Sequence, residues 1–175
     1  MKKVKLILVD GPMGAGKTTV AQLLHKNLKY SALISLDPLK RLYSEFKSGD
    51  KKSLEIASDV GSAMAKTYLD KGINVIVEKA FTDRKFLTQF IKSSKTKNAK
   101  VYVYQIEAPL ETRIERIKKR SIAKPKYKKP TLKRINKNHE NYKTLRYENA
   151  IIFDSSKLTP RKIIKEILKE VKNNF

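Results

Sequence analysis

The stretch Gly11-Pro12-Met13-Gly14-Ala15-Gly16-Lys17-Thr18 constrains the fold of this chain more than any other feature. It matches the pattern G-x-x-x-x-G-K-[ST], which is typical of a loop that binds phosphate groups between a strand and a helix. Residues 4–9 before it are mostly apolar, as expected of a short buried strand. Residues 17–28 after it place apolar side chains at helical spacing. The context therefore predicts a strand, a phosphate-binding loop and a helix in direct succession.

The residue types of this loop follow from what an anion requires. Glycines can adopt backbone angles closed to other residues, so that successive N–H groups curl around a phosphate. The N-terminus of the following helix adds partial positive charge at the same place. Lys17 can reach the β- and γ-phosphate oxygens, and the Thr18 hydroxyl is suited to ligate Mg²⁺. The loop residues expected to bind a nucleotide are Gly11, Met13, Gly14, Ala15, Gly16, Lys17, Thr18 and Thr19.

The size and composition of the chain predict one domain, residues 1–175, with a core of its own. Apolar residues make up 40% of the sequence, and no run of them approaches the roughly 18 needed to span a membrane. There is no cysteine, which excludes disulfides and thiolate metal sites. The start, Met1-Lys2-Lys3 before the first expected strand, leaves no room for a signal peptide. We therefore expect a cytoplasmic protein.

The charge of the chain is strongly unbalanced. Forty Lys and Arg residues oppose 17 Asp and Glu, which gives a net charge of +23, and Lys supplies 32 of the forty. Such an excess predicts salt-dependent attraction to polyanions such as RNA. The alternative is a Lys-rich proteome, in which Lys simply occupies solvated faces, and the sequence leaves both explanations open.

Strands and helices are expected to alternate along the chain. Expected strands cover residues 4–9, 33–35, 73–77, 101–106 and 150–153. Expected helices cover residues 17–28, 38–70 with a break near 48–50, a segment capped by Thr82 and Asp83, 110–120, and a segment after Pro160. Alternation with near-continuous apolar strands predicts an α/β fold, a three-layer α-β-α sandwich around a five-stranded parallel sheet.

In such folds ligands bind beyond the carboxyl ends of the strands. Polar residues should therefore be sought where each expected strand ends. These are Asp10–Thr18, Asp37, Glu78, Glu107 and Asp154-Ser155-Ser156.

One segment near this edge differs from the rest of the chain. Between Arg116 and Lys137 there are eleven basic residues and no acidic one, apolar residues are sparse, and Pro125 and Pro130 interrupt it. Such a composition cannot form a core by itself. We therefore expect residues 116–138 to be a mobile basic lid segment beside the ligand edge.

With these features together, the chain resembles the small P-loop kinases, a group that includes adenylate, shikimate and gluconate kinases. It is most similar to the branch that holds polynucleotide kinase, chloramphenicol phosphotransferase, zeta-toxin kinases and seryl-tRNA kinases. Four stretches besides the loop carry the likeness: Ser35–Arg41, Val75–Glu78, Ala108–Glu111 with Arg116 and Arg120, and Phe153–Ser156. The resemblance covers nearly the whole chain and implies the strand order 2-3-1-4-5.

On the acceptor side, the resemblance implies that Asp37 is the general base or orients the acceptor hydroxyl. The alternative is that Asp37 caps the next helix ahead of Pro38. Lys40 and Arg41 are implied to hold an anionic acceptor, or are two solvated charges. Glu78 is implied to touch the acceptor or to join the Mg²⁺ shell, with a strand-end ion pair as the alternative.

On the donor side, the resemblance implies that Arg116 and Arg120 stack on adenine or neutralise the γ-phosphate, because guanidinium groups suit both tasks. They are otherwise a solvated basic face of one helix. Asp154 is implied to form the edge of the adenine pocket with the two serines that follow it. Asp10 either caps the turn before the loop or joins the Mg²⁺ shell through water.

Other motifs are less informative. No Asp has Gly three residues later, which excludes the switch of a GTPase, and Asn136–His139 ends in His where a guanine-binding motif ends in Asp. His25 and His139 are isolated and do not indicate a metal site. Tyr127, Tyr142 and Tyr147 are suited to stack on bases or to pack at the surface or in the core.

The sequence thus predicts an ATP- and Mg²⁺-dependent kinase. Its acceptor is a hydroxyl of a nucleotide, of a small metabolite or of a nucleic acid such as RNA. The alternative function is a nucleic-acid-associated P-loop ATPase that uses ATP as a switch. No feature of the sequence indicates an oligomeric state.

Overall fold

A single parallel sheet organises the computed structural model, which describes residues 3–47, 50–81, 83–95, 98–123, 130–143 and 149–173. Its strands are β1 (Lys5–Asp10), β2 (Ser31–Ser35), β3 (Asn74–Glu78), β4 (Lys100–Glu107) and β5 (Ile151–Asp154). They lie in the order β2-β3-β1-β4-β5, all parallel, which confirms the predicted topology. Because β1 is central, the loop that follows it lies in the middle of the sheet's carboxyl edge.

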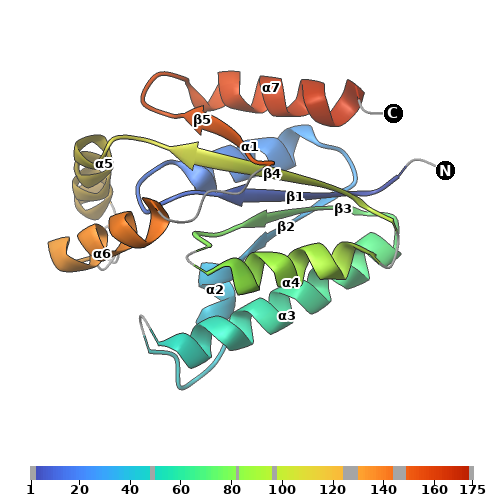
Figure 1. The fold of residues 1–175 in the computed structure, drawn as a ribbon, viewed down its shortest axis with the longest axis horizontal. Helices are drawn as coiled ribbons and strands as arrows, with labels where there is room; N and C mark the ends of the chain where they lie inside the picture. Colours follow the sequence, from blue (N-terminus) through green and yellow to red (C-terminus); the bar gives the residue numbers. More distant parts are fainter. Residues whose placement is uncertain are drawn as a thin grey trace.

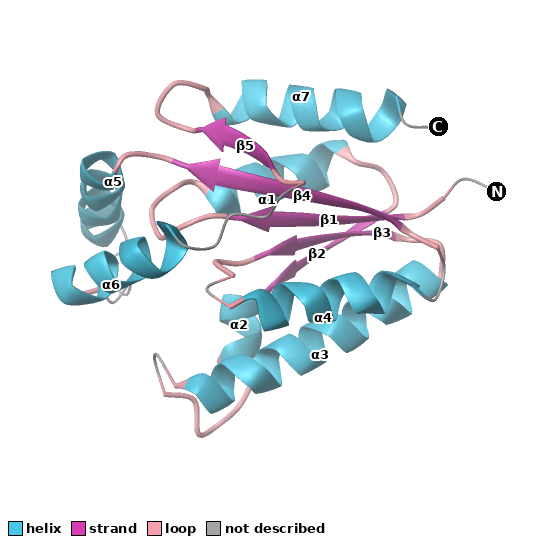
Figure 2. Ribbon diagram, viewed as in Figure 1, coloured by secondary structure: helices cyan, strands magenta, loops and turns pink. Residues whose placement is uncertain are grey.

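Seven helices are described: α1 (Lys17–Asn27), α2 (Leu36–Lys40), α3 (Lys51–Asp70), α4 (Arg84–Ser94), α5 (Leu110–Ala123), α6 (Leu132–Lys143) and α7 (Pro160–Asn173). Helices α1 and α7 cover one face of the sheet, and α3 and α4 cover the other (Figures 1 and 2). Helices α5 and α6 lie beyond the carboxyl ends of the strands, at the left of Figure 1. The predicted three-layer α/β sandwich is confirmed.

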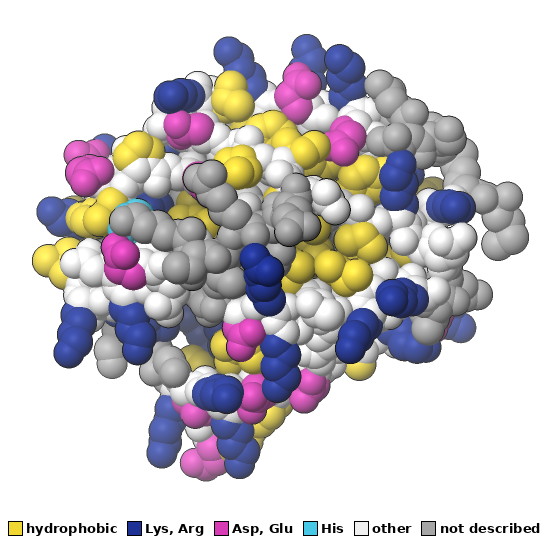
Figure 3. Space-filling model, viewed as in Figure 1, with side chains coloured by type: hydrophobic (Ala, Val, Ile, Leu, Met, Phe, Trp, Pro, Cys, Tyr) yellow, Lys and Arg dark blue, Asp and Glu magenta, His cyan; other side chains and the backbone are white. Residues whose placement is uncertain are grey.

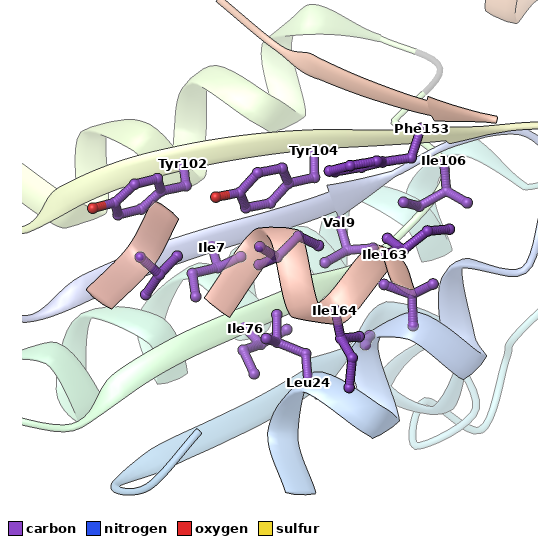
Figure 4. Packing of buried hydrophobic residues seen from close by; sticks show 14 of the residues in the cluster. Ile7, Val9, Leu24, Ile76, Tyr102, Tyr104, Ile106, Phe153, Ile163 and Ile164 are labelled. Carbon is purple, nitrogen blue, oxygen red and sulfur yellow. The ribbon is translucent and has the colours of Figure 1, made fainter. Parts of the chain in front are cut away.

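Alternation along β1 builds the two cores. Ile7 and Val9 point to the layer of α1 and α7, whereas Leu6 and Leu8 point to the layer of α3 and α4. Figure 4 shows the first of these clusters, in which side chains of the strands meet those of the two helices. A strand that is apolar on both faces must be covered on both, and this fixes β1 in the centre of the sheet.

Helix starts mostly follow their sequence signals. The predicted break between the helices after β2 corresponds to Asp50, whose carboxylate accepts hydrogen bonds from the N–H groups of Lys52 and Ser53 at the start of α3. Asp83 caps α4 by accepting from the N–H of Lys85 at 2.8 Å. Thr82, expected to share that role, lies outside the described residues.

The basic lid segment contains more regular structure than its composition indicates. Helix α5 continues to Ala123, and α6, which the sequence analysis did not predict, begins at Leu132. Ile117 and Ile135 are each only 1% exposed, so both helices pack against the interior, whereas the composition of the segment indicated no core element. Residues 124–129 lie outside the described residues. No helix in the described part of the chain is long and apolar enough to cross a membrane.

Candidate active site

The loop after β1 has the backbone that its glycines permit. Gly11 has φ of +148°, and a Cβ built on it would lie 2.1 Å from the carbonyl oxygen of Ile106 in β4. Gly16, the N-cap of α1, has φ of +96°. Only glycine fits the first position, since any side chain there would collide with the neighbouring strand. The loop is thereby held against β4, with the N-terminus of α1 directed at its concave side.

Lys17 lies within this loop rather than in solvent. It is 8% exposed, and its Nζ donates to the carbonyl oxygen of Pro12 at 3.1 Å. Burial lowers the pKa of Lys17, although the acids Glu78, Asp10 and Asp37 oppose the shift. The ammonium is therefore placed at the loop by a contact that an incoming phosphate oxygen can replace.

Thr18 and Glu78 face one another across the ends of β1 and β3. The Thr18 hydroxyl donates to Glu78 Oε1 at 3.2 Å, and Glu78 is 9% exposed. A hydroxyl and a carboxylate oxygen are both ligands that Mg²⁺ accepts. This contact places Glu78 beside the candidate metal ligand. Among the described residues there is no group of three or more His, Cys, Asp or Glu that could hold a metal.

Asp37 is the second residue of α2, immediately beyond β2. The N-cap position belongs to Ser35, so Asp37 does not cap this helix. Its side chain is 81% exposed, and its Oδ1 accepts from Lys40 Nζ at 2.7 Å. Partial desolvation opposes ionisation, but Lys40, then Lys17 and Lys79, outweigh it and lower the pKa of the Asp37 carboxyl. The group is a carboxylate at neutral pH.

Three further basic residues lie on this side of the sheet. Lys40 is the partner of Asp37, whereas Arg41, at the C-cap of α2, is exposed. Lys79, which directly follows β3, is 6% exposed. Burial, reinforced by Lys40, lowers the pKa of Lys79 to about 7. The structure therefore adds one buried cation to the predicted acceptor side.

Arg116 of α5 joins the loop to the segment after β5. Its Nη1 donates to Ser155 Oγ and its Nη2 to the Ser155 carbonyl oxygen, each at 2.8 Å, and Nη1 lies 3.5 Å from the Gly14 carbonyl oxygen. The Ser155 hydroxyl also contacts the carbonyl oxygens of Ala15 and Glu107, at 2.7 and 3.0 Å. Arg116 thus fixes the wall of the site by hydrogen bonds to the protein.

A cavity of about 280 Å³ opens beside this contact. Its lining residues come from the loop, the start of α1, α5 and the turn before α7: Gly14, Gly16, Thr19, Val20, Arg116, Arg120, Ser155 and Pro160. Arg120 lies close enough to Lys17 to contribute to its pKa. Asp154 is next to the cavity but does not line it, because its carboxylate bonds to Ser156 and pairs with Lys157 at 3.8 Å.

Helix α6 holds the outer side of the loop. Asn138 Oδ1 accepts from the N–H of Met13 at 2.9 Å, so this predicted nucleotide-binding N–H is engaged within the protein. Arg113, fully buried in α5, donates to the Met13 carbonyl oxygen at 3.3 Å and lies 2.7 Å from His139 Nδ1. Helices α5 and α6 are therefore coupled to each other and to the loop backbone.

Asp10 is the buried anchor below the loop. Its Oδ1 accepts from the N–H groups of Gly11 and Phe81, at 2.7 and 2.8 Å, and its Oδ2 from Gln105 and Tyr142, at 3.4 and 3.0 Å. Burial raises its pKa, while the hydrogen bonds from Phe81 and Gly11 oppose the rise. This arrangement favours the turn-capping role over the metal shell. It also assigns Tyr142 to the core; Tyr127 and Tyr147 lie outside the described residues.

Several residues of the site lack a signal in the sequence. Arg113, Asn138 and Tyr142 act through backbone or buried carboxylate contacts that cross more than 90 residues of chain. Ser155 was recognised only as part of a strand ending. Lys79 carried one available signal, namely a charge placed directly after an apolar strand that ends at the ligand edge.

Comparisons with known proteins agree with this geometry. A family model described as an AAA domain, AAA_33, matches residues 6–145. Among solved structures, the chain is similar to the APS kinase of Mycobacterium tuberculosis in complex with AMPPNP and APS, at 16% identity and a TM-score of 0.73, covering 98% of this chain and 99% of that chain. A sugar kinase from Janibacter sp. HTCC2649 has 14% identity and a TM-score of 0.73, covering 97% and 95%.

The match to the Pnkp1/Rnl/Hen1 RNA repair complex has 17% identity and a TM-score of 0.69, covering 82% of this chain and 45% of that chain. A search of curated proteins gives no match. At these identities the structural likeness shows the fold, which is that of the P-loop kinases. Since the family model covers most of the sequence, the chain belongs to the AAA domain family AAA_33.

Proposed function

We propose that the protein is an ATP- and Mg²⁺-dependent kinase that transfers the γ-phosphoryl group to a hydroxyl. The observation that supports this most directly is the position of Lys17. Its charge is influenced by Asp37 and Glu78 at the ends of β2 and β3, and by Arg120 at the cavity beside β5. The loop thus lies between a nucleotide-sized cavity and an ionised carboxylate, which is the order that phosphoryl transfer requires.

On the donor side, the cavity would take the nucleoside of ATP, and the loop would take its phosphates. The first N–H groups of α1 have no partners within the helix and point at the concave side of the loop. Arg120 lines the cavity and supplies positive charge for the phosphates. Arg116 keeps this wall in place through Ser155. Donor binding therefore depends on Arg120 by charge and on Arg116 by position.

The Thr18 hydroxyl and the Glu78 carboxylate fit a Mg²⁺ ion. The Thr18 Oγ1 and Glu78 Oε1 atoms lie 3.2 Å apart. Bound there with one or two protein ligands and phosphate oxygens, as Mg²⁺ usually is, the ion would neutralise phosphate charge. This proposal moves Glu78 from acceptor binding to the metal shell.

On the acceptor side, Asp37 would accept a hydrogen bond from the attacking hydroxyl and take its proton. Its lowered pKa keeps it ionised and able to accept. Lys40, which pairs with it, limits its rotation and can turn toward an anionic group of the acceptor. Arg41 is exposed beside α2 and is available for a larger acceptor. Positioning and charge neutralisation together account for most of such a reaction.

The net charge of +23 favours a second possibility, a nucleic-acid-associated ATPase that uses ATP as a switch. In Figure 3 the coloured Lys and Arg side chains are distributed over one face and interleaved with Asp and Glu. This distribution favours a solvated Lys-rich surface on that face. We therefore favour a phosphoryl-transferring kinase over an ATP-dependent switch, and we keep RNA among the acceptors to be tested.

The test is transfer from labelled ATP to a panel of nucleosides, nucleotides, sugars, hydroxy acids and short RNAs. Lys17→Ala should abolish transfer, with Lys26→Ala on the exposed side of α1 as the matched control. Asp37→Asn should keep ATP binding and lose transfer by about 10²- to 10⁴-fold, whereas Asp59→Asn should not. Slow ATP hydrolysis with no phosphorylated acceptor would favour the switch, and full activity of Lys17→Ala would exclude the kinase.

A further inference from the structure

Lys79 is a buried lysine whose Nζ has no hydrogen-bond acceptor within the described residues. It follows the last residue of β3 and is 6% exposed. Within the part of the chain that the structure describes, its enclosed Nζ has no hydrogen-bond partner. The nearest recorded group is the Phe86 ring of α4, whose centre lies 5.1 Å from Nζ.

This arrangement is unfavourable for the protein alone. An ammonium group carries three N–H donors, and burial without acceptors removes their hydration without replacing it. A contact with an aromatic ring offsets part of the charge desolvation but accepts no conventional hydrogen bond. Apolar side chains of similar size are as stable or more stable at such positions. A structural role therefore does not explain why this residue is a lysine.

The position of Lys79 relates it to the acceptor side. Its N–H donates to the carbonyl oxygen of Val9 at 3.2 Å, which fixes its backbone at the end of β1. Asp37 is close enough for Lys40, Lys17 and Lys79 to act on its carboxyl. Among these three cations, Lys40 pairs with Asp37 and Lys17 contacts Pro12. Lys79 alone has no polar partner among the described residues.

The other acids near Lys79 are already engaged. Asp10 accepts four hydrogen bonds, and Asp83 accepts from the N–H of Lys85 as the cap of α4. Asp37, Asp10 and Asp83 all act on the pKa of Lys79, but among the described residues none of them accepts a hydrogen bond from its Nζ. An incoming anion would supply the missing acceptors.

We propose that Lys79 binds an anionic group of the phosphoryl acceptor, and that the acceptor is a small molecule carrying both a hydroxyl and a separate phosphate, sulfate or carboxylate group. This inference rests on the proposed kinase function for its meaning, since it assumes that Asp37 faces the acceptor. The hydroxyl would lie at Asp37, and the anionic group would displace the Phe86 contact. The flexible stem of lysine allows its ammonium to turn toward that group.

The chain offers a close control. Lys85 also lies over the Phe86 ring, with its Nζ 6.0 Å from the ring centre, but its side chain is 69% exposed and it lies 3.6 Å from Glu55. The variants Lys79→Met and Lys85→Met therefore remove a cation from the same ring. Only the first removes the enclosed ammonium. Lys79→Arg keeps the charge.

The first measurement uses inorganic sulfate as the probe. AMPPNP and Mg²⁺ at saturation occupy the phosphate loop, and sulfate is then titrated by calorimetry. We expect sulfate to bind the wild type and Lys85→Met with similar affinity. It should bind Lys79→Met at least tenfold more weakly, and it should bind Lys79→Arg with nearly wild-type affinity. Thermal unfolding without sulfate should show Lys79→Met at least as stable as the wild type. Equal sulfate affinity in Lys79→Met and the wild type, or no sulfate binding to the wild type, would overturn the proposal.

The second measurement compares pairs of acceptors that differ by one anionic group, such as adenosine with AMP and glycerol with glycerol 3-phosphate. In the wild type the anionic member should be preferred, and in Lys79→Met its KM should rise at least tenfold with little change for the neutral member. The proposal would also be overturned if the wild type preferred the neutral member of each pair. It would be overturned as well if RNA were the preferred acceptor and its phosphorylation were unchanged in Lys79→Met. Absence of any transfer would count against the kinase, while the sulfate titration still decides the role of Lys79.

Discussion

The phenol of Tyr142 donates a hydrogen bond to Asp10 Oδ2 at 3.0 Å, which ties α6 to the residue that ends β1. Asp10 is fully buried, and its Oδ1 accepts from the N–H of Gly11, the first residue of the loop. The Asp10 carboxylate therefore holds both α6 and the first residue of the phosphate loop in place.

Tyr142→Phe tests this link. The change removes one donor from a buried carboxylate, which should lower the free energy of unfolding by about 1–3 kcal/mol. Urea denaturation gives this quantity, and Tyr30→Phe, at a side chain that is 83% exposed, is the control. An unchanged unfolding midpoint in Tyr142→Phe would mean that the hydrogen bond adds nothing to stability.

Ser155→Ala tests the wall of the nucleotide cavity. It removes the hydroxyl that bonds to Ala15 and accepts from Arg116, so Arg116 should keep its bond to the Ser155 carbonyl oxygen but be held less firmly. We expect ATP to bind about fivefold more weakly, from the loss of roughly 1 kcal/mol. Fluorescent nucleotide titration measures this. Ser156→Ala, next in sequence and bonded only to Asp154 among the described residues, should bind as the wild type does.

Glu78→Gln tests the proposed metal shell. The amide keeps the size of the side chain but loses its charge, so the Mg²⁺ concentration for half-maximal nucleotide binding should rise about tenfold or more. Glu45→Gln, at an exposed site, should leave it unchanged. If Glu78→Gln instead raised only the KM of the acceptor, Glu78 would return to acceptor binding.

Comparing Gly11→Ala with Gly72→Ala separates two reasons why a position requires glycine, namely a steric clash of the added Cβ and a positive φ angle. At Gly11 a Cβ would meet the Ile106 carbonyl oxygen at 2.1 Å, whereas at Gly72, with φ of +78°, no heavy atom lies within 4 Å. We expect Gly72→Ala to lower stability by about 1–2 kcal/mol from backbone strain, and Gly11→Ala by roughly 3 kcal/mol or more from added overlap. Chemical denaturation of both variants should give this order, and equal losses would contradict the close approach of loop and β4.

The pH dependence of transfer should show where Asp37 ionises. Its desolvation is outweighed by Lys40, Lys17 and Lys79, so its folded pKa lies below the ordinary value of 3.8. The carboxylate is therefore present at higher pH, and its contribution is lost only as the pH falls through that lowered value. The ratio of wild-type to Asp37→Asn activity should stay level from about pH 8 to about pH 5. A ratio that falls between pH 7 and 5 would assign the proton transfer to another group.

The fold was predictable because its signals are local. The glycine spacing after β1 and the apolar strands determine a parallel α/β sheet, and the strand order is as the resemblance implied. Asp37, Glu78 and the loop were singled out because each lies at or just beyond the end of a strand, and the structure places these strand ends at one edge of the sheet. Their separate roles were less predictable. The proposal that Glu78 joins the Mg²⁺ shell with Thr18 depends on a contact between two residues that lie 60 positions apart in the sequence.

Helix α6 was missed for a physical reason. Its buried face combines Ile135 with Asn138 and Tyr142, so most of its anchoring is polar and gives little hydrophobic periodicity. Arg113 is similar, because a basic residue on a basic helix gives no indication that it is buried. Contacts that depend on hydrogen bonds to distant backbone are specified by the assembled fold rather than by local sequence.

The central position of β1 divides the molecule into two sides that different parts of the gene encode, and this division affects how the protein can evolve. On one side of β1 lie β2 and β3, and these strands with helices α2, α3 and α4 come from residues 31–95, which include Asp37, Glu78 and Lys79. Everything on the other side comes from residues 100–173, including Arg120 and Ser155. A gene that recombines at two points, between α1 and β2 and between α4 and β4, would therefore exchange the proposed acceptor side and keep the loop, α1 and the cavity side intact. New substrates can arise in such proteins by block exchange, without rebuilding the machinery that handles the donor.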